Sequence, residues 1–143
     1  MSGESIPSGV QITPTVARGA LFQALNPDLP TRLDFIAGQA VTTALSPDGK
    51  TLLIVTSGYN RTNGPDGRRI PTESKEYVFV FDVSNKTPVK RQVIQVPNTF
   101  TGLVWHPSGK EFYVSGGADD NVHVYEVRGG GLDGSRRYPN RPR

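Results

Sequence analysis

The chain has 143 residues, of which 35% are hydrophobic, with 16 glycines, 12 prolines and no cysteine. This length suits one domain, and the lack of cysteine excludes a disulfide framework, thiolate catalysis and a cysteine-based zinc site. The net charge of +3 resides in residues 128–143, where five arginines and one aspartate give +4, so residues 1–127 sum to −1. Because the folded part is not basic, the charge argues against nucleic-acid binding.

Residues 1–19 are small, polar and interrupted by proline, and we expect an extended N-terminal arm there. They lack the basic start and apolar stretch of a signal peptide, and no segment approaches the roughly 20 apolar residues of a membrane span. Residues 20–25 then predict one short strand, and 26–30 a turn-rich connector. At the other end of the chain, we expect residues 128–143 to form a disordered basic tail.

From residue 40 onward, short apolar runs alternate with turns, which predicts an antiparallel β-meander. Two turns, Ser-Pro-Asp-Gly-Lys at 46–50 and His-Pro-Ser-Gly-Lys at 106–110, are 60 residues apart. In each turn, proline fixes φ early and glycine can adopt the positive φ that other residues resist. The predicted strands are residues 40–45, 51–56, 77–83, 89–96, 101–105, 111–115 and 122–127.

These strands form a sequence repeat. The turns match at an offset of 60, whereas the third strands, 77–83 and 121–127, match at an offset of 44. The difference of 16 residues is an insertion in the first repeat, at about residues 58–75. A unit of about 44 residues is typical of a four-stranded propeller blade. Residues 40–96 and 101–127 therefore predict two blades of an all-β propeller.

Three segments carry a family resemblance: Leu-Ser-Pro-Asp-Gly-Lys-Thr-Leu-Leu-Ile-Val at 45–55, Tyr-Val-Ser-Gly-Gly at 113–117 and Asp-Asp-Asn-Val-His-Val-Tyr at 119–125. In these segments the chain resembles the YVTN-type bacterial β-propellers, relatives of the WD40 and lactonase-like propellers. It is most similar to the exported module that precedes an alkaline-phosphatase-like domain in some bacteria, which implies a periplasmic protein. The phosphatase-like domain and its metal ligands have no counterpart here, so the resemblance implies no catalytic activity.

Two blades are too few to close a ring, because propellers have typically four to eight. The strand predicted at 122–127 leaves an open edge, which the strand predicted at 20–25 could pair with, within one chain or between chains. Two blades would also expose their flat apolar outer faces, which monomers rarely tolerate. We therefore expect homo-oligomerisation to complete the ring, with three or four copies favoured.

Ligand sites of propellers usually gather on the face that carries the loops between second and third strands and between blades. Here this ligand face would consist of residues 58–75, 97–99 and 116–121, and it would suit a small anionic or sugar ligand, because arginine forks bind such groups bidentately. A flexible polar loop that bridges to a neighbouring subunit is the alternative for the insertion. The candidate ligand-binding residues are Tyr59, Asn60, Arg61, Arg68, Arg69, Asn98, Asp119 and Asp120.

No cofactor or metal site is predicted. Asp119 and Asp120 could bind a divalent cation such as calcium, but a turn also favours aspartate. The only two histidines, His106 and His123, lie in different parts of the repeat, and the serines have no evident His and Asp partners for a hydrolytic triad. The sequence thus favours a self-assembling binding scaffold. The alternative is a hydrolase, a phosphoesterase or lactonase-like enzyme, with an active site at the oligomer axis.

Overall fold

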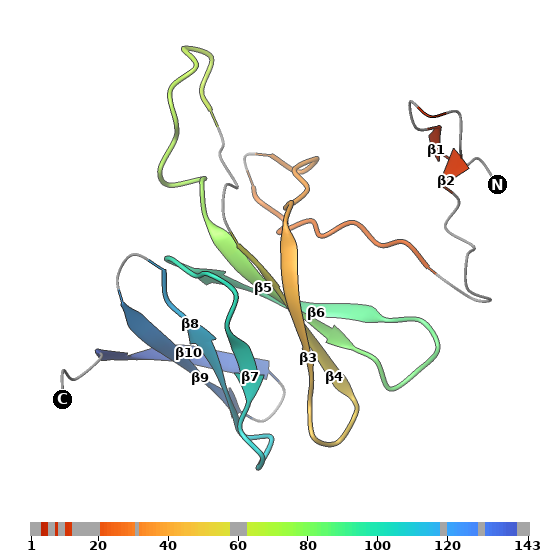
Figure 1. The fold of residues 1–143 in the computed structure, drawn as a ribbon, viewed down its shortest axis with the longest axis vertical. Coiled ribbons are helices and arrows are strands. Elements are labelled where there is room, and N and C mark those ends of the chain that lie inside the picture. Colours follow the sequence, from red (N-terminus) through yellow and green to blue (C-terminus); the bar gives the residue numbers. More distant parts are fainter. Residues whose placement is uncertain are drawn as a thin grey trace.

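The computed structural model describes residues 4–5, 8, 11–12, 21–30, 32–57, 63–117, 120–128 and 131–139; for 4–5, 11–12, 128 and 131–139 it describes the backbone alone. The ordered elements within these residues are β-strands joined by turns (Figure 1), as the all-β prediction required. In the region predicted to be an extended arm, β1 (Glu4–Ser5) and β2 (Gln11–Ile12) pair antiparallel. No helix in the described part of the chain is long and apolar enough to span a membrane.

The first large sheet is an antiparallel meander of four strands. Its strands, in both chain and spatial order, are β3 (Ala40–Leu45), β4 (Thr51–Thr56), β5 (Glu76–Asp82) and β6 (Val89–Val96). The predicted bounds match those of β3, β4 and β6, and β5 lies one residue earlier than predicted. Local alternation and turn residues were therefore sufficient to locate the strands of this sheet.

The second large sheet repeats the same meander. It contains β7 (Leu103–Trp105), β8 (Glu111–Ser115) and β9 (Asn121–Arg128), and the backbone of β10 (Gly131–Pro139) pairs antiparallel with β9. Within the predicted tail of residues 128–143, the backbone of 131–139 thus follows β9 as a strand. Pairing to a free strand edge uses main-chain groups, so the polar composition of this segment did not prevent it.

The N-terminal segment 21–30 and 32–37, which we call the strap, also differs from the prediction. Its first residues, 21–25, do not form a strand, and they lie against the first sheet instead of completing the second. The Gln23 side-chain amide donates to the Pro88 carbonyl over 2.9 Å, and the Ala37 N–H donates to the Leu25 carbonyl over 2.8 Å. The strap thus covers one face of the first sheet as irregular chain.

The two faces of the first sheet both carry buried apolar side chains. We call the face with Leu53, Val55, Val78 and Val80 its A face, and the opposite face its B face. The B face carries Leu52, Ile54, Tyr77, Phe79 and Phe81, and the last three of these are buried beneath Ala37, Leu25 and Phe35 of the strap.

The A and B faces of the second sheet are those that carry the residues equivalent, in the sequence repeat, to the A and B residues of the first sheet. The A face of the second sheet carries Tyr113, Val122 and Val124, and its B face carries Phe112, Val114, His123 and Tyr125, because facing pairs in the β8–β9 ladder share a side. The main core forms where the A face of the first sheet packs on the B face of the second. The two sheets are therefore stacked with unlike faces in contact.

The first strands of the two sheets lie against each other and are joined by side-chain hydrogen bonds. The Thr42 hydroxyl donates to the Thr101 carbonyl over 2.7 Å, and the Trp105 indole N–H donates to the Ala44 carbonyl over 3.2 Å. The proline-glycine turns also meet, since a Cβ placed on Gly109 would lie 3.6 Å from the Pro47 ring. Gly49 and Gly109 have φ of 72° and 69°, as the turn pattern predicted.

Candidate functional site

The loops predicted to bind a ligand lie at the ends of the sheets away from the proline-glycine turns. Of the eight candidate residues, Tyr59, Asn60, Arg61 and Asp119 lie outside the described residues. The described part of the insertion, 63–75, extends away from both sheets (Figure 1). The proposed site can therefore be assessed at Arg68, Arg69, Asn98 and Asp120.

Arg68 and Arg69 make their interactions within the insertion itself. The Arg68 side chain is 89% exposed, with its Nε 3.9 Å from the Asp66 carboxylate. Arg69 donates from Nη2 to the Ser74 carbonyl over 3.3 Å. An ion pair this exposed stabilises little, so the two guanidinium groups are presented to solvent on a projecting loop.

Asn98 belongs to a closely packed junction between two of the predicted loops. A Cβ on Gly117 would overlap the Asn98 side-chain amide, so a larger residue at 117 would require that side chain to move. The Asn98 carbonyl also lies 3.1 Å from Nε2 of His123, whose side chain is 1% exposed. Residues 97–99 and 116–117 are thus adjacent, and His123 contacts the first of these loops from the core.

Asp120 is an exposed turn residue with φ of 48°, a conformation that Asp and Asn tolerate better than most residues. Its N–H lies 3.3 Å from the Gly117 carbonyl, which closes the turn before β9. No group of three or more His, Cys, Asp or Glu within the described residues is arranged to hold a metal ion. The turn therefore accounts for this aspartate.

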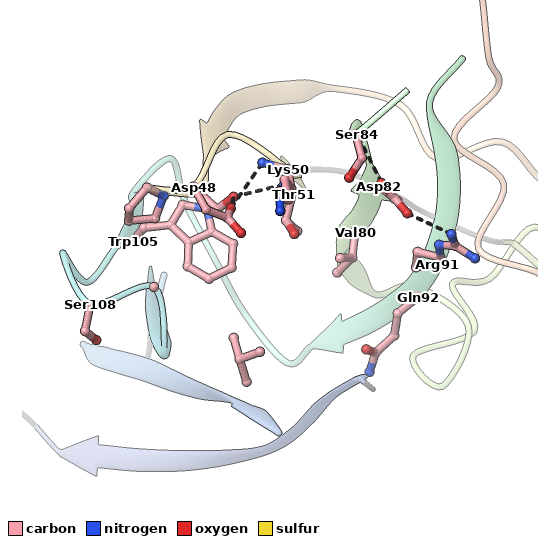
Figure 2. A pocket seen from close by; sticks show the side chains of 14 residues that line it. Asp48, Lys50, Thr51, Val80, Asp82, Ser84, Arg91, Gln92, Trp105 and Ser108 are labelled. Atoms are coloured by element: carbon pink, nitrogen blue, oxygen red, sulfur yellow. Dashed lines mark hydrogen bonds and ion pairs between the residues drawn. The ribbon is translucent and has the colours of Figure 1, made fainter. Parts of the chain in front are cut away.

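A cavity lies at the opposite end of the molecule, between the two sheets and beside the proline-glycine turns. Its volume is about 560 Å³, within the roughly 300–1,000 Å³ of small-molecule sites. Figure 2 shows Trp105 and Asp48 on one side and Asp82 with Arg91 on the other. Its lining consists of Ser46, Pro47, Asp48, Lys50, Thr51, Val80, Asp82, Ser84, Arg91, Gln92, Trp105, Ser108, Gly109 and Val127.

Asp82 and Arg91 form a hydrogen-bonded ion pair in the lining of the cavity. Arg91 Nη2 lies 2.7 Å from Asp82 Oδ2, and the Ser84 N–H donates to Asp82 Oδ1 over 2.9 Å. The hydrogen bond from Arg91, with those from Ser84, lowers the pKa of Asp82 to about 2. These contacts fix the carboxylate in its charged form in the lining of the cavity, where the Arg91 side chain remains 62% exposed.

Asp48 is held by its own turn on the other side. The Ser46 hydroxyl donates to Asp48 Oδ1 over 2.6 Å, and the Lys50 N–H donates to the same atom over 3.1 Å. The Ser46 hydrogen bond, followed by that of Lys50, lowers the pKa of Asp48. At neutral pH the lining therefore holds two carboxylates and, with Lys50 and Arg91, two cations.

Trp105 supplies the large apolar surface of the cavity. Its indole N–H is already bonded to the Ala44 carbonyl, and its ring lies 5.4 Å from that of Phe112 at 57°. Both contacts fix the ring while its outer part stays half-exposed. The sequence repeat contained one signal for this cavity, since tryptophan stands at 105 where the first repeat has Leu45.

The Asp82–Arg91 pair predicts a specific acid dependence of stability. The pKa of Asp82 falls from 3.8 to about 2 on folding, so its stabilising contribution is complete above about pH 4 and is lost as the pH falls through 2. We expect Asp82→Asn to unfold more easily than the wild type at pH 6 and to lose less stability between pH 5 and 2. Urea unfolding at pH 6, 4, 3 and 2 measures both effects.

Asp34→Asn is the matched control, because it removes an exposed carboxylate outside the cavity. The acid dependence of this variant should remain that of the wild type. If Asp82→Asn and the wild type lost stability in parallel from pH 5 to 2, the ion pair would not form in solution.

No protein-family model, curated protein or solved structure matches this chain. The resemblance to YVTN-type propellers, the hydrolase alternative and the periplasmic location therefore stay predictions.

Proposed function

We propose that the chain is a two-blade β-propeller module that assembles head to tail with copies of itself and acts as an interaction scaffold. The observation that carries the proposal is the packing of the A face of one sheet on the B face of the next. A sheet-to-sheet relation of this kind can be repeated, because it leaves an A face at one end of the stack and a B face at the other. Contacts between unlike surfaces generate rings when the rotation closes.

The order of strands supports the same proposal. Both sheets are meanders in chain order, and their first strands, β3 and β7, lie together. In a propeller the first strand of each blade lies nearest the axis, and a repeat of about 44 residues is typical of one blade. Two such units supply part of a ring, and three or four copies would supply six or eight blades.

The surfaces required for assembly are partly open. On the A face of the second sheet, Val104 is 56% exposed and Val122 is 38% exposed. On the B face of the first sheet, the strap covers β5, whereas Leu45 on β3 is 55% exposed. Because these positions repeat the residues that form the core between the two sheets, the partner that fits them best is a second copy of the chain.

Native mass spectrometry and light scattering of the full chain test the proposal, and three or four copies are the expected result. Val104→Glu places a carboxylate on the open A face, on strand β7, where burial without a partner costs several kcal/mol. We expect this variant to be monomeric at concentrations that assemble the wild type, with unchanged strand content by circular dichroism.

Val89→Glu is the matched control, since Val89 is 44% exposed but lies on neither open face. It should assemble as the wild type does. A monomeric wild type, or equal assembly of Val104→Glu, would overturn the proposed head-to-tail contact.

A further inference from the structure

We propose that the cavity between the two sheets is a binding site for a neutral carbohydrate the size of a mono- or disaccharide. The site goes beyond the proposed assembly, because its lining is built from the two sheets of a single chain and the turns beside them. It also lies at the end opposite to the loops that the sequence favoured.

The charge of the lining argues for a neutral ligand. Asp48 and Lys50 on one side, and Asp82 and Arg91 on the other, give two negative and two positive groups. Arg91 is already paired with Asp82 at 2.7 Å, so an anion would have to compete with a carboxylate for the guanidinium group. A cation would compete with Arg91 for Asp82 in the same way. A neutral polar ligand displaces neither partner.

The hydrogen-bonding groups suit adjacent hydroxyl groups. A guanidinium group has five N–H donors and a carboxylate accepts several hydrogen bonds, so the Asp82–Arg91 pair offers an acceptor and a donor side by side. One of two neighbouring sugar hydroxyls can donate to the Asp82 carboxylate while the other accepts from the Arg91 guanidinium group. Charge-assisted hydrogen bonds of this kind are roughly twice as strong as neutral ones, and the pair is held in place before a ligand binds.

The apolar surfaces suit the C–H face of a sugar ring. Trp105 uses its only polar atom on the Ala44 carbonyl, so the indole presents a flat apolar face to the cavity. Val80 and Val127 add aliphatic surface to the lining. An aromatic ring beside fixed polar groups is the combination that binding sites use to orient a small ligand. A pyranose presents both kinds of surface at once.

Titration of the full chain with glucose, galactose, mannose, N-acetylglucosamine and cellobiose, followed by saturation-transfer NMR and calorimetry, tests the assignment. We expect saturable binding of at least one sugar, with a Kd of about 1 mM or lower. Inorganic phosphate is the anionic probe and choline is the cationic probe, and neither should compete. Absence of sugar binding up to about 10 mM, or competition by either charged probe, would overturn the proposal.

Two variants locate the binding site within the cavity. Trp105→Phe keeps an aromatic core residue but removes the larger ring, and Asp82→Asn removes the charged acceptor; each should weaken sugar binding at least tenfold. Arg68→Ala, on the projecting insertion, is the control and should bind as the wild type does. Far-UV circular dichroism and urea unfolding identify loss of folding, because Trp105 is the only tryptophan and its removal alone changes the near-UV spectrum. If both cavity variants bound the sugar as tightly as the wild type, the cavity would not be the site.

Discussion

Phe112→Ala is expected to lower the free energy of unfolding by about 3–5 kcal/mol, the usual cost of deleting a buried aromatic side chain. Phe112 is fully buried on the B face of the second sheet. Its ring stacks on Tyr125, with centroids 4.9 Å apart and planes 10° apart, and it also contacts the Trp105 ring. Because the side chain sits between two hydrogen-bonded sheets, the structure can collapse only partly into the space that it leaves.

Urea unfolding of Phe112→Ala and Phe100→Ala provides the measurement and its control. Phe100 is 67% exposed, so the same chemical change there should alter stability by no more than about 0.5 kcal/mol. A loss for Phe112→Ala as small as that for Phe100→Ala would mean that the two sheets do not pack through their A and B faces.

The sequence predicted the part of the fold that local patterns determine. Val78 and Val80 alternate with Phe79 and Phe81, and this local alternation puts apolar side chains on both faces of the first sheet. The turns were predicted from proline and glycine at fixed positions, and Gly49 and Gly109 adopt the required positive φ. Such features depend on residues close in the chain, so they can be recognised without knowing the tertiary structure.

The strap and β10 could not be predicted from local patterns. Leu25, Phe35 and Ala37 have no strand or helix period, and what orders them is an apolar face formed by residues of β4, β5 and β6. β10 is held by main-chain pairing with β9, which requires no particular side chains. In both cases a surface built elsewhere in the fold determines the structure of the segment.

The cavity combines residues that are far apart in the sequence. Asp48 comes from the β3–β4 turn, Asp82 from the end of β5 and Trp105 from β7, and only the stacking of the two sheets brings them together. The Asp82–Arg91 pair could have been predicted from the sequence, because the two residues flank a predicted hairpin. Their distance of 2.7 Å depends on the β5–β6 register, which includes an irregularity between Val80 and Phe81.

A chain that begins at Gly38, and so lacks the strap, should lose about 2–4 kcal/mol of stability. The expected loss reflects two partly buried large side chains, each worth roughly 1.5–3 kcal/mol when fully buried. The deletion would uncover Tyr77, Phe79 and Phe81, which are at most 4% exposed in the complete chain. Urea unfolding measures the loss, and binding of an apolar dye reports the uncovered face.

The strap is also anchored by a charged contact, since Lys90 Nζ lies 2.7 Å from the Asn26 carbonyl and 2.6 Å from Asp28 Oδ2. The matched control is a chain that begins at Leu21, which keeps every strap contact given above. It should not bind the dye more strongly than the complete chain. Equal dye binding by all three chains would mean that the strap does not cover the B face in solution.

Burial raises the pKa of the Tyr77 hydroxyl, with a smaller contribution from the charge of Glu73. Removing the strap should therefore also return this pKa towards 10.0, which ultraviolet titration against a Tyr77→Phe version of the same chain would detect.

The same deletion should strengthen the proposed assembly although it weakens the fold, because it frees more of the B face for a second copy. A weaker protomer that associates more tightly is thus the expected result. If association weakened as well, the strap would belong to the contact between copies.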